Sequence, residues 1–312
     1  MKKLLLFIFS VTFYLYSFSF SKDTITPAIH HIEMPLIKKG DDIIKHTGFT
    51  LCYNEQHEQA SWVAYELTDI KANGQEARTN KFVIDPLVST GTADNRDYGG
   101  SGYDRGHLAP AADMAWSETT MQESFYFSNM SPQTPSFNRG IWKKLEEQVR
   151  EWAIENKIIY VTTGPVLSDH LPQIGPNKVS VPQFYYKVLL DFDKPEQKAI
   201  GFILPNEASS GELSTFAVSI DSVEAITGIN FFHHLPDDIE QLLESRFDAK
   251  KWFSENKNFD QHHPKPIKSS NEKKDSETHN HNHAIQCVAV TKKGTRCKNM
   301  TKDNNNRCGI HR

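Results

Sequence analysis

Cysteine is scarce in this chain, and the little that is present lies mostly at one end. Only 4 of the 312 residues are cysteine, and Cys287, Cys297 and Cys308 lie close to the C-terminus, which leaves Cys52 alone in the long N-terminal part. A small domain held together by disulfides would need paired cysteines spread through the fold. The sequence therefore excludes a disulfide framework for the main part of the protein.

Two further absences narrow the class of protein. Beyond the first residues no stretch is both apolar enough and long enough to span a bilayer, for which about 20 residues are needed. Positive charge is not in excess either, since 35 lysines and arginines stand against 39 acidic residues. This balance excludes a protein coated in basic residues. It leaves a local basic groove open, because binding to phosphates depends on where the charges lie.

Residues 1–21 have the layout of a secretory signal peptide. Two lysines precede an apolar run over residues 4–16, and Ser19 and Ser21 supply the small residues of a cleavage site. The alternative is an uncleaved membrane anchor, for which the apolar run is short. We expect cleavage, a mature protein that is secreted or periplasmic, and no stable membrane association after signal cleavage.

Residues 22–256 carry the hydrophobic patterning of one folded domain. A helix is predicted where Ile141, Leu145, Val149 and Trp152 recur at helical spacing with charged residues on the opposite face. A second helix is expected from Asp237 to Leu243, directly after a proline. Five β-rich runs are expected to form strands: residues 62–67, 81–84, 158–162, 184–190 and 199–204. The mixture predicts an α+β fold with a mostly antiparallel sheet.

The composition changes after this domain. Residues 257–284 are rich in Pro, Ser, Lys, Glu and His and contain almost no apolar residue, which predicts a disordered linker. Its histidines either bind metal ions weakly or belong to a solvated spacer.

Residues 285–312 gather four soft metal ligands: Cys287, Cys297, Cys308 and His311. Four such ligands in a short basic segment predict a tetrahedral, structural Zn²⁺ site, and so small a segment would depend on the metal to fold. A disulfide between two of the cysteines is the alternative, because an exported protein meets an oxidising compartment.

The segment YDRGHLAPAADM, residues 103–114, needs a chemical explanation. Taken alone, DRGH is equally consistent with a buried Asp–Arg pair beside a structural histidine. The downstream chain adds Asn129 and Asn138 just ahead of the predicted helix, and Glu146 within it. A neutral histidine can deprotonate water near neutral pH, and an amide oxygen can ligate a hard divalent cation. Hydrolysis of a phosphodiester needs both, which makes His107 the candidate base.

Arg105 and Glu146 extend this set. Arg105 precedes His107 by two residues, so both side chains should lie on one side of an extended strand, where the guanidinium could reach the same phosphate. Glu146 follows Asn138 by eight residues, about 12 Å along a continuous helix, so both cannot ligate one ion directly. If Asn138 precedes the helix start, Glu146 could hold a water on the metal; otherwise it is a solvent-facing charge. Asp104 is expected to brace the strand.

Over nearly all of residues 50–240 the chain resembles the DNA/RNA non-specific endonuclease family of the ββα-metal (His-Me finger) superfamily. The matching segments are WVAYELT, RTNKFVIDP, YDRGHLAPAADM, YFSNMSPQTPSFNRGIWKKLEEQ, VTTGPVL, VPQFYYKVLL and FAVSIDSVEAITGINFF followed by LPDD. The resemblance implies the ββα-metal nuclease fold, with helices flanking the sheet. It also implies an Mg²⁺-dependent hydrolase, with Mn²⁺ as a substitute ion, that cuts both DNA and RNA and leaves 5′ phosphates.

The same resemblance implies a role for each site residue. His107 falls on the general base, Asn138 on the direct Mg²⁺ ligand, and Glu146 on the acid that orders metal-bound water. Asn129 falls on a supporting asparagine of the site, and Arg105 on the arginine that contacts the scissile phosphate.

Two points of the family pattern are less well matched. Arg78 is the nearest candidate for a second, upstream, substrate-binding arginine, but its spacing to Asp85 differs from that of some members. The usual disulfides of the family are not evident, since Cys52 has no obvious partner in the domain.

Two functions are open on this sequence. The first is an exported, Mg²⁺-dependent nuclease that cuts DNA and RNA without sequence preference, either as a monomer or as a homodimer. The second is a non-catalytic metal- or nucleic-acid-binding envelope protein on the same fold. A base, a ligand, an acid and an arginine together favour the nuclease, because binding alone would not need His107. In a nuclease the basic tail would add a tethered, salt-sensitive grip on nucleic acid.

Overall fold

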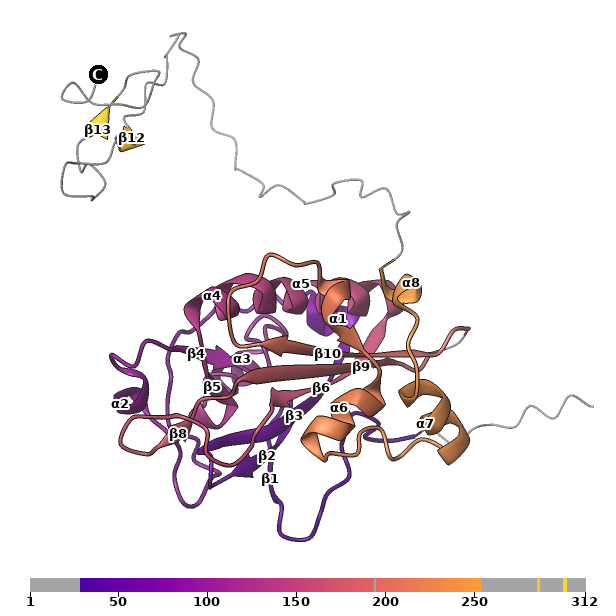
Figure 1. Ribbon diagram of the computed structural model, residues 1–312, viewed down its shortest axis with the longest axis horizontal. Coiled ribbons are helices and arrows are strands. Elements are labelled where there is room, and N and C mark those ends of the chain that lie inside the picture. Colours follow the sequence, from indigo (N-terminus) through magenta and orange to yellow (C-terminus); the bar gives the residue numbers. More distant parts are fainter. Residues whose placement is uncertain (1–28, 194, 254–284, 287–299, 302–312) are drawn as a thin grey trace, which may run out of the picture. The chain divides into compact units, whose positions relative to one another are not determined.

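The computed structural model describes residues 29–193, 195–253, 285–286 and 300–301 (Figure 1). The predicted signal peptide, the predicted linker and the four predicted zinc ligands (Cys287, Cys297, Cys308 and His311) lie outside the described residues.

The chain divides into two compact units, Met1–Lys257 and Asn258–Arg312. The described part of the second unit is a pair of short antiparallel strands, β12 (Ile285–Gln286) and β13 (Met300–Thr301).

The first unit is built on a seven-stranded sheet in which every neighbouring pair is antiparallel. Its strand order is β1 (Asp42–Lys45), β2 (Thr50–Asn54), β3 (Gln59–Thr68), β6 (Ile158–Pro165), β9 (Phe184–Asp191), β10 (Lys198–Pro205) and β11 (Ala217–Val218). Four of the five predicted strands lie within β3, β6, β9 and β10, so they and the mostly antiparallel sheet are confirmed. Two further antiparallel pairs stand apart from this sheet: β4 (Asp104–His107) with β5 (Met130–Gln133), and β7 (Gln173–Ile174) with β8 (Val179–Ser180).

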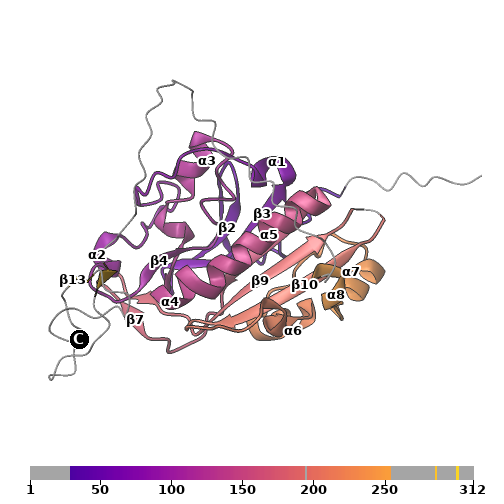
Figure 2. The same ribbon diagram turned by 90° about the horizontal axis from the view of Figure 1, so that it is seen from above.

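The helices cover both faces of the large sheet. One face is covered by α5 (Lys143–Asn156), and the other by α6 (Ile220–Thr227) and α7 (Asp237–Glu244) (Figures 1 and 2). The shorter helices are α1 (Asp69–Ala72), α2 (Asn95–Tyr98), α3 (Glu118–Glu123), α4 (Pro135–Phe137) and α8 (Ala249–Trp252), with 3₁₀ turns at Phe127–Asn129 and Leu213–Phe216. No helix in the described part of the chain is long and apolar enough to cross a membrane.

Alternation along β3 explains this layering. Val63, Tyr65 and Leu67 lie in one core cluster with Leu145, Val149 and Trp152 of α5. Trp62 and Ala64 point the other way, into a cluster with Ile220 and Val223 of α6 and Leu243 of α7. Successive side chains of a strand face opposite sides, so a strand that is apolar at both sets of positions must be buried on both faces.

The predicted strand at residues 81–84 is wrong. Within it only Val83 pairs, through a single parallel bridge to Tyr126. Phe82 packs its ring against Phe125 and His107, and Ile84 is 52% exposed. Phe82 therefore packs beside His107, and the segment does not extend the sheet.

Candidate active site

His107 ends the short strand β4, which pairs with β5 so that His107 lies opposite Met130 and Gly106 opposite Ser131. Gly106 has no room for a side chain, because a Cβ there would lie 2.2 Å from the buried side chain of Gln133. The glycine of DRGH is thus required by the close approach of β5. Leu108 and Ala109, which follow His107, are buried in the same cluster as α5 and fix the exit of the strand.

The imidazole of His107 is buried and lies among aromatic rings. Its ring centroid is 4.8 Å from that of Phe125 and 5.8 Å from that of Phe82, and its Nε2 has no hydrogen-bond partner among the described residues. Burial, reinforced by the positive charge of Arg78, lowers the pKa of His107 to about 3. The imidazole is therefore neutral at physiological pH and available to accept a proton.

Two arginines lie against the same aromatic rings that His107 contacts. Arg78 places its guanidinium carbon 4.9 Å from the centroid of Phe125, and Arg105 places its own 4.6 Å from the centroid of Phe82. Arg105 also donates a 2.8 Å hydrogen bond to Oδ1 of Asn95. Because Arg105 and His107 both contact Phe82, the prediction that they share one side of the strand is confirmed. Arg78, the nearest candidate for the second arginine that the family resemblance implies, also lies against a ring that His107 contacts, that of Phe125.

Asn138 is tied to the other end of β4. Its Nδ2 donates a 2.9 Å hydrogen bond to Oδ2 of Asp104, and the same carboxylate accepts from Nε (2.8 Å) and Nη2 (2.6 Å) of Arg139. Asp104 thus braces the strand against the downstream turn, as predicted. Since the amide nitrogen of Asn138 is used in this bond, the orientation of its oxygen is fixed.

The chain between Asn138 and Glu146 is not one continuous helix. A π-helical turn over Asn138–Trp142 separates α4 from α5, and Gly140 within it has non-helical angles (φ −108°, ψ −112°). Asn138 therefore precedes the start of α5, which is the arrangement that the sequence required if Asn138 and Glu146 were to serve one site. The predicted helix is confirmed from Lys143 onward, whereas Ile141 and Trp142 lie in the turn.

Glu146, itself half-buried, lies within a group of charges that includes the buried Lys187 and Asp113. Burial raises the pKa of Glu146, and Lys187 opposes that rise most strongly; Asp113 adds to it, while Arg150 and Arg78 also oppose it. Burial lowers the pKa of Lys187, which Glu146 opposes in turn. A solvent-facing charge, the alternative considered from the sequence, would not be shifted in this way.

The other members of this charge group were not predicted. Lys187 lies on β9, is fully buried, and holds Nζ 4.9 Å from the ring centroid of Trp142 without a hydrogen-bond partner among the described residues. Arg150 forms a 2.8 Å ion pair with Asp113, which also accepts a 2.8 Å hydrogen bond from the Tyr65 hydroxyl. The sequence feature that could have revealed this group is the lysine inside the apolar run FYYKVLL, because a buried lysine needs a nearby acid.

Most of this chain matches a known protein family. A model of the family described as DNA/RNA non-specific endonuclease matches residues 30–238. The chain belongs to this family. It is 36% identical over 214 residues to Nuclease C1 of Cunninghamella echinulata var. echinulata, which covers 62% of this chain and 84% of that protein. It is 32% identical over 212 residues to a nuclease of Nostoc sp., with 64% and 76% covered.

Among solved structures, the chain is similar to EndoG in a crystal structure of the EndoG/EndoGI complex. The TM-score is 0.62 at 31% sequence identity, and the match covers 68% of this chain and 95% of the other. The ββα-metal fold predicted from the sequence is thereby confirmed; here β4, β5 and α5 supply the two strands and the helix, and β4 lies beside α4 in both views (Figures 1 and 2).

In this endonuclease-family site, Asn129 contacts the backbone of the chain that follows His107. It is fully buried, its Nδ2 donates to the backbone oxygens of Ala109 (3.0 Å) and Ser124 (2.8 Å), and its Oδ1 accepts from the backbone nitrogen of Ala109 (2.9 Å). These bonds hold the chain just after His107. Asn129 therefore acts as a positioning residue for the chain that follows His107.

The residues present fit the divalent cation that this nuclease family implies. Asn138 offers a neutral amide oxygen in a fixed orientation, and Glu146 offers an acid whose charge is favoured by Lys187, Arg150 and Arg78. Hard oxygen donors of this kind suit Mg²⁺, which retains several waters when bound.

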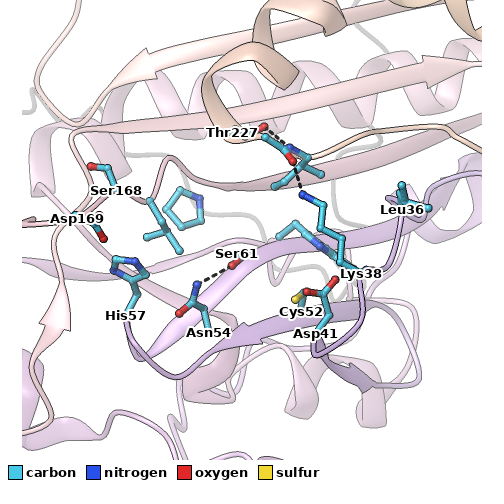
Figure 3. Close-up of a pocket in the computed structure, with 15 residues that line it drawn as sticks. Leu36, Lys38, Asp41, Cys52, Asn54, His57, Ser61, Ser168, Asp169 and Thr227 are labelled. Carbon is cyan, nitrogen blue, oxygen red and sulfur yellow. Dashed lines mark hydrogen bonds between the residues drawn. The ribbon is translucent and has the colours of Figure 1, made fainter.

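A separate pocket of about 520 Å³ lies elsewhere on the endonuclease domain (Figure 3). It is lined by Cys52 and Trp62, whose side chains belong to the sheet face opposite α5, and by Lys38, whose Nζ donates to the oxygen of Gly228. None of the predicted active-site residues lines it. Cys52 is a free thiol here.

Proposed function

We propose that this chain is an Mg²⁺-dependent endonuclease that hydrolyses phosphodiester bonds of DNA and RNA without sequence preference and leaves 5′-phosphate ends. The observation that carries the proposal is the neutral, buried His107 imidazole without a hydrogen-bond partner among the described residues, flanked by two arginines. A binding protein gains nothing from such a group. A hydrolase needs it as a base.

In this proposal His107 accepts a proton from the attacking water. Because its surroundings disfavour the imidazolium, the ring stays neutral until the reaction supplies the proton. Arg105 and Arg78 donate hydrogen bonds to the phosphate. Their guanidinium groups lie against the rings of Phe82 and Phe125, which His107 also contacts. Phosphate contacts of this kind carry no base information, which accords with cleavage that does not depend on sequence.

Asn138 would hold the Mg²⁺ through its amide oxygen, and Glu146 would hold it through water. The bound ion would supply neutralisation of the charge that develops on the phosphate and on the departing 3′ oxygen. Asp104 orients the amide of Asn138 by accepting a hydrogen bond from its Nδ2, and Arg139 in turn donates a hydrogen bond to Asp104. Mn²⁺ is proposed as a substitute, since it prefers similar oxygen ligands.

Export and the tail extend the proposal. The signal-peptide layout of residues 1–21 supports a secreted or periplasmic enzyme, and the four soft ligands of residues 285–312 support a structural Zn²⁺ site or, alternatively, a disulfide. We also propose that the enzyme is either a monomer or a homodimer, and light scattering of the purified protein distinguishes the two.

The proposal is tested by digesting matched plasmid DNA and RNA with Mg²⁺ and with EDTA. We expect cleavage of both with Mg²⁺, none with EDTA, and a loss of at least about 100-fold for His107→Ala, the low end for a general base. His30→Ala, at an exposed histidine, is the control and should cut normally. Binding of nucleic acid without cleavage would instead favour the non-catalytic envelope protein.

A further inference from the structure

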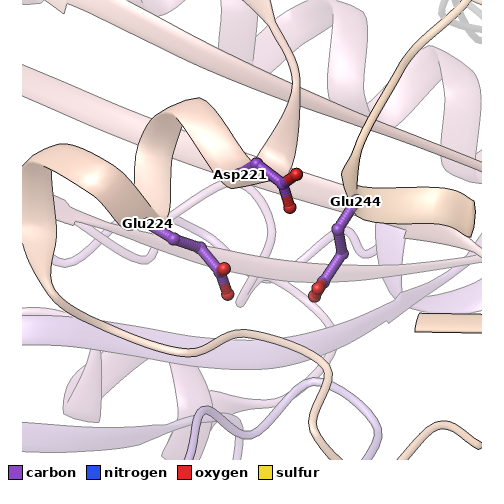
Figure 4. A group of neighbouring side chains, drawn as sticks. All are labelled: Asp221, Glu224 and Glu244. Carbon is purple, nitrogen blue, oxygen red and sulfur yellow. The ribbon is translucent and has the colours of Figure 1, made fainter. Parts of the chain in front are cut away.

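Three carboxylates gather between α6 and α7, on the side of the sheet away from α5. Asp221 and Glu224 come from α6, and Glu244 is the last residue of α7. One oxygen from each lies within 4.8 Å of the other two. Figure 4 shows the three side chains directed into a common space.

Glu244 is the unusual member of this group. It is only 5% exposed, and its Oε1 is buried without a hydrogen-bond partner among the described residues. Burial, together with the neighbouring carboxylates Glu224, Glu240 and Asp221, raises the pKa of Glu244 to about 9. A buried acid oxygen aimed at two other acids is costly unless something positive or a proton lies between them.

Among the described residues, no lysine or arginine shifts the pKa of Glu224, Glu240 or Glu244. Burial raises the pKa values of Glu224 and Glu240, and neighbouring acids add to the rise. The groups that oppose it are uncharged: the backbone N–H of Phe231 for Glu224 and the side chain of Asn230 for Glu240. A cation from solution can balance these charges in place of a proton on Glu244.

The ligand set favours Ca²⁺ over Mg²⁺. Three protein carboxylates in one place suit Ca²⁺, which takes many oxygen ligands in a flexible geometry, whereas Mg²⁺ usually binds through one or two carboxylates and keeps several waters. Asp221 is exposed, so water can complete the six to eight ligands that Ca²⁺ takes.

We propose that Asp221, Glu224 and Glu244 form a calcium site that joins the C-terminal end of α7 to α6. This site is separate from Asn138 and the nuclease centre, and it stabilises the fold without taking part in cleavage.

The site is tested on the full chain, freed of metal with EDTA and dialysed, by calorimetry and thermal unfolding with Ca²⁺ or Mg²⁺. At a Ca²⁺ concentration about 20 times the dissociation constant, the melting temperature should rise by about 4–7 °C. Because the free Glu244 carboxyl is protonated at pH 7, binding should release about one proton, seen as a dependence of the heat on the buffer.

Glu244→Gln keeps the shape of the side chain and should abolish both effects while leaving nucleic-acid cleavage with Mg²⁺ unchanged. Asp238→Asn removes one negative charge from an exposed position on the same helix and should leave both effects intact. Equal Ca²⁺ effects in wild type and Glu244→Gln, or equal stabilisation by Mg²⁺ and Ca²⁺, would overturn the proposal. Asn138→Ala, which should lose cleavage but retain the Ca²⁺ effect, separates failure here from failure of the proposed nuclease activity.

Discussion

Asp104 and Asn138 are joined by a 2.9 Å hydrogen bond although 34 residues separate them in the chain. The bond connects the first residue of the strand that ends at His107 to the turn that precedes α5. The strand that carries the proposed base and the turn that carries the proposed metal ligand are therefore tied to each other directly. This contact links the two groups independently of the loops between them.

Asp104→Ala should weaken metal binding because the amide of Asn138 loses the acceptor that orients it. We expect the Mg²⁺ concentration for half-maximal plasmid nicking to rise about 10–100-fold, the usual effect of losing a group that orients a metal ligand. Arg139→Gln removes the ion pair but leaves the Asn138 bond, so it should change this concentration little. An unchanged Mg²⁺ requirement in Asp104→Ala would contradict the assigned role.

Arg78→Gln should shift the pH dependence of cleavage. In the wild type the pKa of His107 is lowered to about 3, so the base stays neutral, and activity should persist, well below pH 6.5. Removing the positive charge of Arg78 raises the pKa of His107, so the acid limb should move to higher pH. The measurement is the initial rate between pH 4 and 8, with Arg105→Gln as control, and a limb that stays in place would count against the coupling.

Gly106→Ala should destabilise the protein through the clash with Gln133. Overpacking a buried site typically costs about 1–3 kcal/mol, measured here as the free energy of unfolding in urea. The added methyl meets the Gln133 side chain, so Gly106→Ala combined with Gln133→Ala should be less destabilised than the sum of the two single variants. Strictly additive losses would place the strain elsewhere.

Lys187→Met should act on the metal site through Glu146. Loss of the Lys187 charge raises the pKa of Glu146 further, so the carboxylate forms only at higher pH. The pH above which the apparent Mg²⁺ affinity becomes constant should therefore move upward. Lys198→Met is a matched control, because Lys198 lies 4.9 Å from the centroid of Trp252 as Lys187 does from that of Trp142, yet Glu146 is not affected by it. Equal shifts in both variants would contradict the role of Lys187.

The sequence predicted the parts of the fold that depend on periodicity. α5 and strands β3, β6, β9 and β10 were found because their apolar residues repeat at the helical or strand period over many residues. Residues 81–84 have the same local character, but Phe82 packs sideways onto Phe125 and His107. A short apolar run does not say which neighbour will bury it.

The site was predictable where the residues are close in sequence and not where they meet only in space. Arg105 and His107 share a side because they lie two apart on a strand. The roles of Asp104 toward Asn138 and of Lys187 toward Glu146 depend on contacts between distant elements, which no local pattern encodes. For Asn129 the sequence identified the residue, but it did not predict the three hydrogen bonds that its side chain makes to the backbone.

The five-residue turn over Asn138–Trp142 sets the angular phase of the helix that follows it. Each residue advances an α-helix by about 100°. An insertion or deletion of a single residue in this turn would swing the Glu146 carboxylate around the axis by that amount, away from Lys187. The length of the turn is therefore a tighter constraint on this enzyme family member than the identity of most side chains within it, and frame-preserving indels there should be far less tolerated than substitutions.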